Sequence, residues 1–282
     1  MLSPVLLAVA DGESFNAGEL IIHHVSDSHD WGFGLSKAVL MMAIAGLLML
    51  LVALRAVKGY DENGVPTTRL AQMIDPFIVH FYRDIALPYV GKKWAPRVTP
   101  LLLNFFFFIL FCNLLGLLPL SDLAGLVGHY TTGHEPFFVE GAATATGNFN
   151  VTATLAVITF VSIQVLGVIQ NGLGAHLAHF MGPPSAPWAV RVLLLIPIEI
   201  ISAFVKPFAL TMRLAANMTA GHMALLALLS IPFLLKSVWV GAPVVLIALA
   251  ITMLEIIVCF VQAYVFALLS GVFIGMAVHS HH

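Results

Sequence analysis

Five ionisable side chains lie in the C-terminal third of the chain, within stretches that are otherwise almost entirely apolar. They are Glu199, Lys206, Arg213, His222 and Glu255. A charged side chain at membrane depth costs at least about 2.5–3.5 kcal/mol on insertion scales, so such residues are expected to have a function. Carboxylates and imidazole accept and release protons, whereas a guanidinium stays protonated. These residue types predict a site that handles protons.

Helical spacing places several polar residues on one stripe. At about 100° per residue, positions three, four or seven apart lie on the same face of an α-helix. That spacing relates five residues of one apolar stretch, which are Glu199, Ser202, Lys206, Arg213 and Asn217. The sequence therefore predicts a polar stripe along one face of a long helix.

His222 is expected on the opposite side of that helix. It follows Arg213 by nine positions, which is about 180° around the helix and about 13 Å along it. On the next apolar stretch, Glu255 and Gln262 are seven positions apart and share a face. An imidazole on the back of the first helix could then meet a carboxylate on the second. This arrangement predicts two separate polar sides.

Some of these residues also have a purely structural interpretation. Lys206 could form an internal ion pair that joins helices, or extend its ammonium to the membrane surface. Ion pairing explains Arg213 less well, because no acidic residue lies within two helical turns of it. Asn217 and Gln262 could form hydrogen bonds between helices instead of holding water or positioning a carboxylate of a partner.

The composition excludes several classes of protein. Of the 282 residues, 60% are apolar and only 9% are charged, whereas a soluble domain has roughly 25% charged residues. Twelve Lys and Arg against fourteen Asp and Glu leave no basic surface for a nucleic acid. The two cysteines, Cys112 and Cys259, lie far apart, so neither a disulfide framework nor a zinc site is expected. The chain is an integral membrane protein.

The apolar runs predict an all-α fold with about five membrane helices. The last two runs hold some forty residues each, and a helix of that length is about 60 Å long, twice the thickness of the bilayer core. Each run is then two spans or one long tilted helix, and we favour a tilted hairpin that turns near 231–241. The predicted membrane helices span residues 35–57, 98–119, 151–175, 192–235 and 240–278.

Basic residues predict the orientation of the chain. Seven of the twelve Lys and Arg lie between positions 55 and 97, and basic loops remain in the cytoplasm. Loops 58–97 and 176–191 are therefore expected inside, and segments 1–34 and 120–150 outside. Within the first loop, apolar spacing predicts an interfacial amphipathic helix over 68–87, with a partner-docking helix as the alternative.

The chain termini offer weaker signals. The opening MLSPVLLAVA hints at a signal peptide but lacks basic residues, so we expect it to remain in the mature chain. The histidines near the ends are interpreted as surface residues, not metal ligands, since no carboxylate or cysteine partners recur at fixed spacing. They are His23, His24, His29 and, in the 279–282 tail, His279, His281 and His282.

The segment Arg213–His222 (RLAANMTAGH) resembles the signature of subunit a of the F-type ATP synthases, R-L-x-x-N-M-x-A-G followed by His or Glu. Further matches are Glu199 fourteen residues before the arginine, Lys206-Pro207 between them, Gln262-Ala263, and the segment Asn113–Pro119 (NLLGLLP). The resemblance covers roughly residue 70 to the C-terminus. Here the arginine helix carries the imidazole and the second helix the carboxylate, as in mitochondrial members, and Ala209 and Thr211 depart from the serine and glycine of some members.

The resemblance implies a stator subunit beside a rotating ring of c subunits, with two offset half-channels for protons. Arg213 would separate the half-channels, His222 and Glu255 would line the outer one, and Glu199 the inner exit. Asn217 and Gln262 would hold water or position the ring carboxylate, with Ser202 and Lys206 in support. No cofactor, metal or nucleic acid is implied, and the subunit is not catalytic alone.

The implied partners are the c ring, the peripheral-stalk subunit b, the rest of the synthase and membrane lipids. Asymmetry of Lys and Arg favours a bacterial plasma membrane, with the mitochondrial inner membrane as the alternative. A proton-coupled secondary transporter is the competing function, although the sequence lacks the paired repeats common in such folds. A structural scaffold would not need an arginine in the middle of an apolar run.

Overall fold

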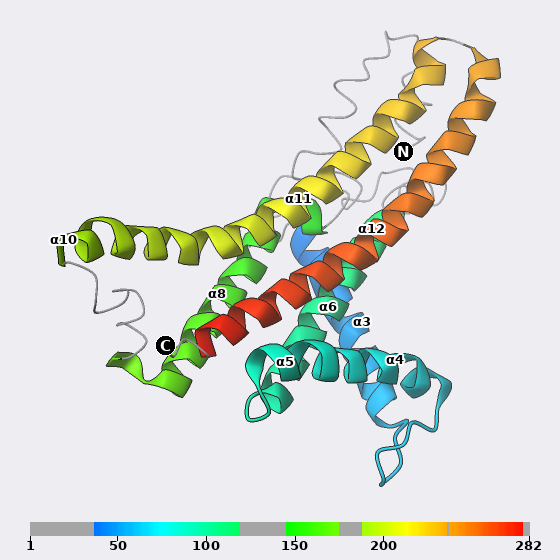
Figure 1. Ribbon diagram of the computed structural model, residues 1–282. Helices are drawn as coiled ribbons and strands as arrows, with labels where there is room; N and C mark the ends of the chain where they lie inside the picture. Colours follow the sequence, from blue (N-terminus) through cyan, green and yellow to red (C-terminus); the bar gives the residue numbers. More distant parts are fainter. Residues whose placement is uncertain (1–36, 119–144, 175–187, 236, 279–282) are drawn as a thin grey trace. The chain divides into compact units, whose positions relative to one another are not determined.

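The computed structural model describes residues 37–118, 145–174, 188–235 and 237–278. Within these ranges the chain is helical and forms no strand, apart from one isolated bridge between Tyr60 and Pro66 (Figure 1). Among the described residues, five helices are long and apolar enough to cross a membrane. The predicted all-α membrane fold is confirmed. Segment 1–34 with the possible signal peptide, most of the 120–150 and 176–191 loops, the 279–282 tail and the six terminal histidines lie outside the described residues.

The long helices are α3 (Lys37–Val57), α6 (Ala95–Leu117), α8 (Phe149–Asn171), α11 (Ile196–Leu234) and α12 (Val238–Val278). Between them lie shorter segments, namely α4 (Arg69–His80), η1 (Phe81–Ala86), α5 (Leu87–Val90), η2 (Ala145–Gly147), α10 (Trp188–Val190) and η3 (Arg191–Leu195).

The last two helices are not each broken into two spans. α11 contains 39 residues and α12 contains 41, and α11 continues through Pro207 and Gly221. Residues 235–237 join them. A helix of this length extends about 58 Å or more, against a bilayer core of about 30 Å. Each helix must therefore cross a membrane at a steep tilt or extend beyond the hydrocarbon region.

The amphipathic segment predicted over 68–87 is helical, but it is not a uniform α-helix. Thr68 caps α4 by accepting a hydrogen bond from the backbone N–H of Ala71 at 3.3 Å. The turn that precedes it is held by Tyr60, whose hydroxyl donates to Asp75 at 3.2 Å. Burial raises the pKa of Tyr60, and the hydrogen bond and negative charge of Asp75 raise that pKa further.

In the part of the chain that the structure describes, two segments form π-helix, and each ends two residues before a proline. η1 precedes Pro88 and η3 precedes Pro197. In each case the residue just before the proline donates its backbone N–H five residues back, from Leu87 to Tyr82 and from Ile196 to Arg191. A proline lacks an N–H and its ring clashes with the carbonyl four residues earlier. A wider turn relieves that clash. Apolar periodicity alone does not predict such a turn.

The chain divides into two compact units, each of which takes parts of several helices. The first comprises Met1–Leu48, Ile109–Val151 and Leu214–Gln262. In its described part, the C-terminal half of α11 and the N-terminal half of α12 form a hairpin with the end of α6. Its buried residues include Ile109, Leu115, Leu214, Met218 and Leu226.

The second unit comprises Met49–Phe108, Thr152–Arg213 and Ala263–His282. Aromatic rings join its helices: Phe77 of α4 stacks on Phe106 of α6 at 5.5 Å between centroids, and Phe105 meets Phe266 of α12 edge-on at 5.6 Å. His80 contacts the Asp84 carboxylate at 2.7 Å and the Tyr264 hydroxyl of α12 at 3.0 Å. The amphipathic segment is thus held to α6 and α12.

Gly275 of α12 lies close against the backbone of α5 at Tyr89. A Cβ atom on Gly275 would collide with the carbonyl oxygen of Tyr89, whereas one on Gly241 in the same helix would have no other atom within 4 Å. We expect Gly275→Ala to destabilise the protein by about 1–3 kcal/mol through overpacking. Gly241→Ala should be neutral or stabilise it by about 0.5–1 kcal/mol, because alanine favours helix.

Thermal unfolding of the detergent-purified variants, followed by tryptophan fluorescence, measures the difference. Equal melting temperatures for the two variants would show that the backbone at Tyr89 moves away from the added methyl group without cost.

Candidate functional site

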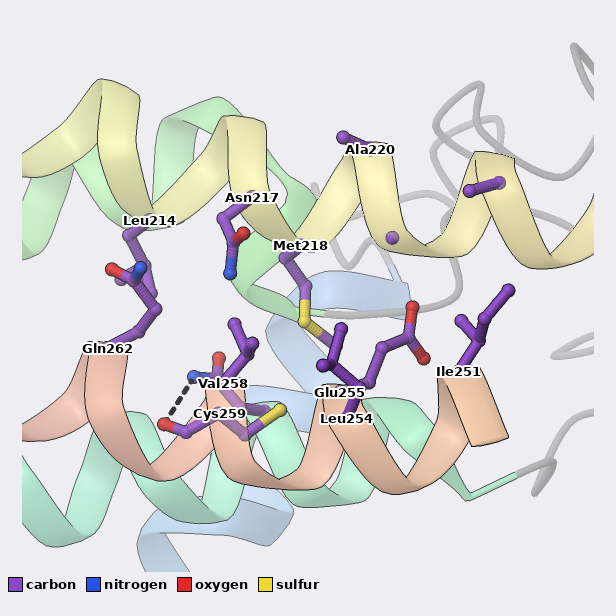
Figure 2. A pocket seen from close by; sticks show the side chains of 13 residues that line it. Leu214, Asn217, Met218, Ala220, Ile251, Leu254, Glu255, Val258, Cys259 and Gln262 are labelled. Carbon is purple, nitrogen blue, oxygen red and sulfur yellow. Dashed lines mark hydrogen bonds between the residues drawn. The ribbon is translucent and has the colours of Figure 1, made fainter. Parts of the chain in front are cut away.

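The first unit contains a pocket of about 310 Å³ between α6, α11 and α12 (Figure 2). Each water needs roughly 10–15 Å³ of such space, so the pocket has room for several. Most of its lining is apolar. The residues that line it are Asn113, Leu214, Asn217, Met218, Ala220, Gly221, Ala224, Ile251, Leu254, Glu255, Val258, Cys259 and Gln262.

Three of the predicted site residues face one another across this pocket. Figure 2 shows Asn217 extending from α11 toward α12, and Glu255 and Gln262 extending from α12 toward α11. All three side chains are partly exposed. A carboxylate and two carboxamides together offer donors and acceptors for water and a group that can take up a proton. The structure therefore places the polar face predicted from the spacing of Glu255 and Gln262 against α11.

Asn113 is a fourth polar residue of the pocket, and its position is tightly defined. The side chain is only 1% exposed. Its Nδ2 donates to the backbone carbonyl of Cys259 at 3.4 Å, and its Oδ1 accepts a hydrogen bond from Thr146 at 2.7 Å. A buried carboxamide with these partners is favourable, because unsatisfied polar groups are costly away from water. Asn113 thus connects α6, α12 and η2 at the edge of the pocket.

Gly221 allows the Glu255 carboxylate to lie directly against the backbone of α11. A Cβ atom on Gly221 would collide with Oε1 of Glu255. Ala220 and Ala224 also line the pocket. Their small side chains leave space between α11 and α12, since small residues allow helix backbones to approach closely in membranes. The glycine of the RLAANMTAGH segment therefore determines how near the carboxylate can come.

His222 follows Gly221 and is 9% exposed. It is not among the described residues that line the pocket. The expected meeting of its imidazole with Glu255 stays a prediction. In helical register His222 is turned about 100° from Gly221, which is the residue that contacts the carboxylate.

The remaining predicted residues belong to the second unit and lie on the N-terminal half of α11. Because α11 is a continuous α-helix over this region, Glu199, Ser202, Lys206 and Arg213 keep the spacing of a single stripe. Arg213 is exposed, and the other three are partly exposed. Within the described residues Lys206 forms no ion pair. Its Nζ lies 5.8 Å from the centroid of the Phe273 ring of α12, a cation–π distance.

Sequence reasoning did not assign Asn113, Gly221 or Cys259 to the site, although the pocket includes all three. A signal existed for two of them. Asn113 is a polar residue inside an apolar span, which by itself suggests a structural or functional contact. Gly221 interrupts a strong helix pattern, as glycines do where a neighbouring group approaches closely. Cys259 carries no such signal, because cysteine is common in apolar interiors.

Comparison with known proteins identifies related sequences over most of the chain. The family described as ATP synthase A chain matches residues 39–275. ATP synthase subunit a of Chloroherpeton thalassium is 38% identical over 93% of this chain and 77% of its own length. The subunit of Anaeromyxobacter dehalogenans is 41% identical over 87% and 58%, and that of Myxococcus xanthus 40% over 88% and 74%.

Proposed function

This chain belongs to the ATP synthase A chain family, and on that premise we propose that it translocates protons through the membrane sector of an ATP synthase. The observation that carries the proposal is the pocket in which Asn217, Glu255 and Gln262 face one another between two long apolar helices. A carboxylate between apolar membrane helices costs free energy to insert, and residues of this kind are therefore expected to have a function. The gradient-driven passage of protons past a ring of c subunits would then be coupled to ATP synthesis.

Arg213 is the proposed separator between the two half-channels. Its guanidinium stays charged and cannot pass on a proton. At about 4 Å and an effective dielectric near 20, a fixed positive charge favours an ionised carboxylate by about 4 kcal/mol. A ring carboxylate that reaches Arg213 would therefore release its proton. The same charge opposes direct passage of a proton between the half-channels.

The surface beside Arg213 supports a partner at this position. Val205, Phe208 and Met212 on the same part of α11 are exposed apolar residues, and Arg213 itself is exposed. An exposed guanidinium within an apolar membrane helix needs an anionic or aqueous partner. The c ring, with one membrane carboxylate on each subunit, provides such a partner.

The pocket is the proposed inner end of the outer half-channel. Protons would enter from outside, reach the region of His222 and Glu255, and pass to the ring with the help of water held by Asn217 and Gln262. Its size admits several water molecules.

Glu199 is the proposed lining of the inner exit, fourteen residues and about 21 Å along α11 from Arg213. We expect Glu199→Gln to slow ATP-driven proton pumping several-fold without stopping it, because an aqueous vestibule offers other routes. Acidification of inverted membrane vesicles at several pH values measures the rate. Pumping equal to wild type from pH 6 to 9 would leave Glu199 with only a packing or pairing role.

The remaining assignments follow from the same proposal. The partners are the c ring, the peripheral-stalk subunit b, the other subunits of the synthase and lipids, and the chain alone catalyses no reaction. The chain is a multi-pass membrane protein, and a bacterial plasma membrane is the proposed location. Purification of the tagged chain from membranes tests the partners directly: a stoichiometric ring of small proteolipids is expected, and its absence would contradict the proposal.

A further inference from the structure

Three exposed basic residues gather where α5 meets α6 in the second unit. They are Lys92, Lys93 and Arg97. From residue 85 to residue 118 the sequence contains no acidic side chain. Within the described residues none of the three forms an ion pair. The junction therefore carries three positive charges that no side chain of the described residues balances.

Two of these cations are held in place by neighbouring groups. Trp94 is only 5% exposed, and its Nε1 donates to Oε1 of Gln170 at 2.6 Å. Lys93 donates to the same oxygen at 3.2 Å. The guanidinium of Arg97 lies 5.2 Å from the centroid of the Trp94 ring. Part of the side-chain ordering that a ligand would otherwise impose is already present, which favours binding.

An exposed apolar surface adjoins the cations. Gln170 and Ile169 belong to α8, and Leu173 follows two residues after the end of that helix. Ile169 and Leu173 are 61% and 63% exposed. The hydrogen bonds to Gln170 bring this part of α8 next to Lys93 and Trp94. A ligand that binds both the cations and the apolar surface would need an anionic head and an apolar tail.

The junction also lies at the level where membrane spans end. The candidate span of α6 begins at Ala95, two residues after Lys93, and that of α8 ends at Asn171, next to Gln170. Tryptophan with lysine and arginine at a span end is typical of the headgroup region. Clusters of basic residues beside a span attract anionic lipids.

We propose that Lys92, Lys93 and Arg97 bind the phosphate headgroup of an anionic phospholipid, whose acyl chains lie on Ile169 and Leu173. A zwitterionic lipid would bring no net negative charge to the three cations. An acidic segment of a protein could pair with the three cations. It would not account for the exposed apolar surface beside them, at the level where the hydrocarbon region begins. This lipid site is independent of the proton path.

Photolabelling of the intact complex tests the site. The complex is reconstituted in phosphatidylcholine with a minor amount of phosphatidylglycerol that carries a diazirine on one acyl chain, or with the matching phosphatidylcholine probe. We expect phosphatidylglycerol to label the peptide with Ile169 and Leu173 more than phosphatidylcholine does. The triple variant Lys92→Gln, Lys93→Gln, Arg97→Gln should lose this preference by about fivefold or more, since each basic residue contributes about that factor near an anionic headgroup.

A matched triple variant separates a specific site from general attraction. Arg55, Lys58 and Arg69 are also exposed basic residues of the same unit, and their replacement by Gln changes the charge by the same amount. Its preference should stay at the wild-type level. If the first triple variant fails to assemble, Lys92→Glu replaces it. The hydrogen bonds and cation–π pairs of this junction are made by Lys93, Trp94 and Arg97, so reversal of the charge at Lys92 should lower the preference in an intact fold.

Several outcomes would overturn the proposal. Equal labelling by both lipids in the wild type, an unchanged preference in the first variant, or an equal loss in both triple variants would each contradict a specific lipid site. Carbodiimide cross-linking of Lys92 or Lys93 to a carboxylate of another subunit, with no lipid label at Ile169 and Leu173, would show that an acidic protein segment covers the junction instead.

Discussion

Arg213→Ala is expected to abolish ATP-driven proton pumping while the assembled complex remains intact. Without a fixed cation, a ring carboxylate could pass the site still protonated, and protons could cross directly between the half-channels. Since Arg213 is exposed on α11, its loss should cost little packing energy. Acidification of inverted vesicles should fall to the background level, with normal amounts of the chain and the c ring in the purified complex.

Arg213→Lys is the informative companion variant. It keeps the positive charge in water, but an ammonium loses its proton more readily than a guanidinium when it is desolvated. We expect most of the activity to be lost in this variant as well. Pumping by Arg213→Ala at close to the wild-type rate would refute the assignment of Arg213 as separator.

The second large effect is expected at His222 and Glu255. Replacement of either by alanine should reduce proton flux about tenfold or more if the two act in one relay, since general acid–base groups contribute effects of that size or larger. The double exchange His222→Glu with Glu255→His should recover more flux than either single exchange. The pair would still supply one imidazole and one carboxylate, whichever helix carries each.

The single exchanges serve as the controls for that experiment. Each single exchange leaves two carboxylates or two imidazoles together. Such like groups titrate as a coupled pair, and their pKa values then move away from the working pH. A double-mutant cycle on flux measures the coupling. Strictly additive losses, with no recovery in the double exchange, would mean that His222 and Glu255 act independently, and contact of Glu255 with Gly221 would then be its main interaction with α11.

The helical architecture could be predicted from the sequence because its cause is local. Long apolar runs must be helical in a bilayer, where each backbone group needs a partner within its own segment. Turn residues are scarce between 192 and 278, and for that reason the sequence favoured an unbroken hairpin over four short spans. The uninterrupted helices α11 and α12 agree with this prediction. The π turns before Pro88 and Pro197 were missed, since they arise from a steric clash and not from hydrophobic pattern.

The pocket could be predicted only in part. Spacing along one helix placed Glu255 and Gln262 on a common face, and they do line the pocket together. Spacing cannot tell which residue of a neighbouring helix lies opposite, because that depends on how closely the two backbones approach. Gly221 and the hydrogen-bonded Asn113 govern that approach, and their contribution became visible only from contacts between residues distant in sequence.

The wide turn of η1 absorbs one residue more than an α turn requires, just before Pro88. Loss of a single residue between 81 and 86 would return the segment to α geometry and leave α4 and α5 in nearly the same angular phase. Phe77 would then keep its stack on Phe106. The same loss inside α4, where the geometry is already α, would rotate the residues before it by about 100°. In the evolution of this segment, the π turn is therefore the place where one residue can be gained or lost without misaligning the side chains around it.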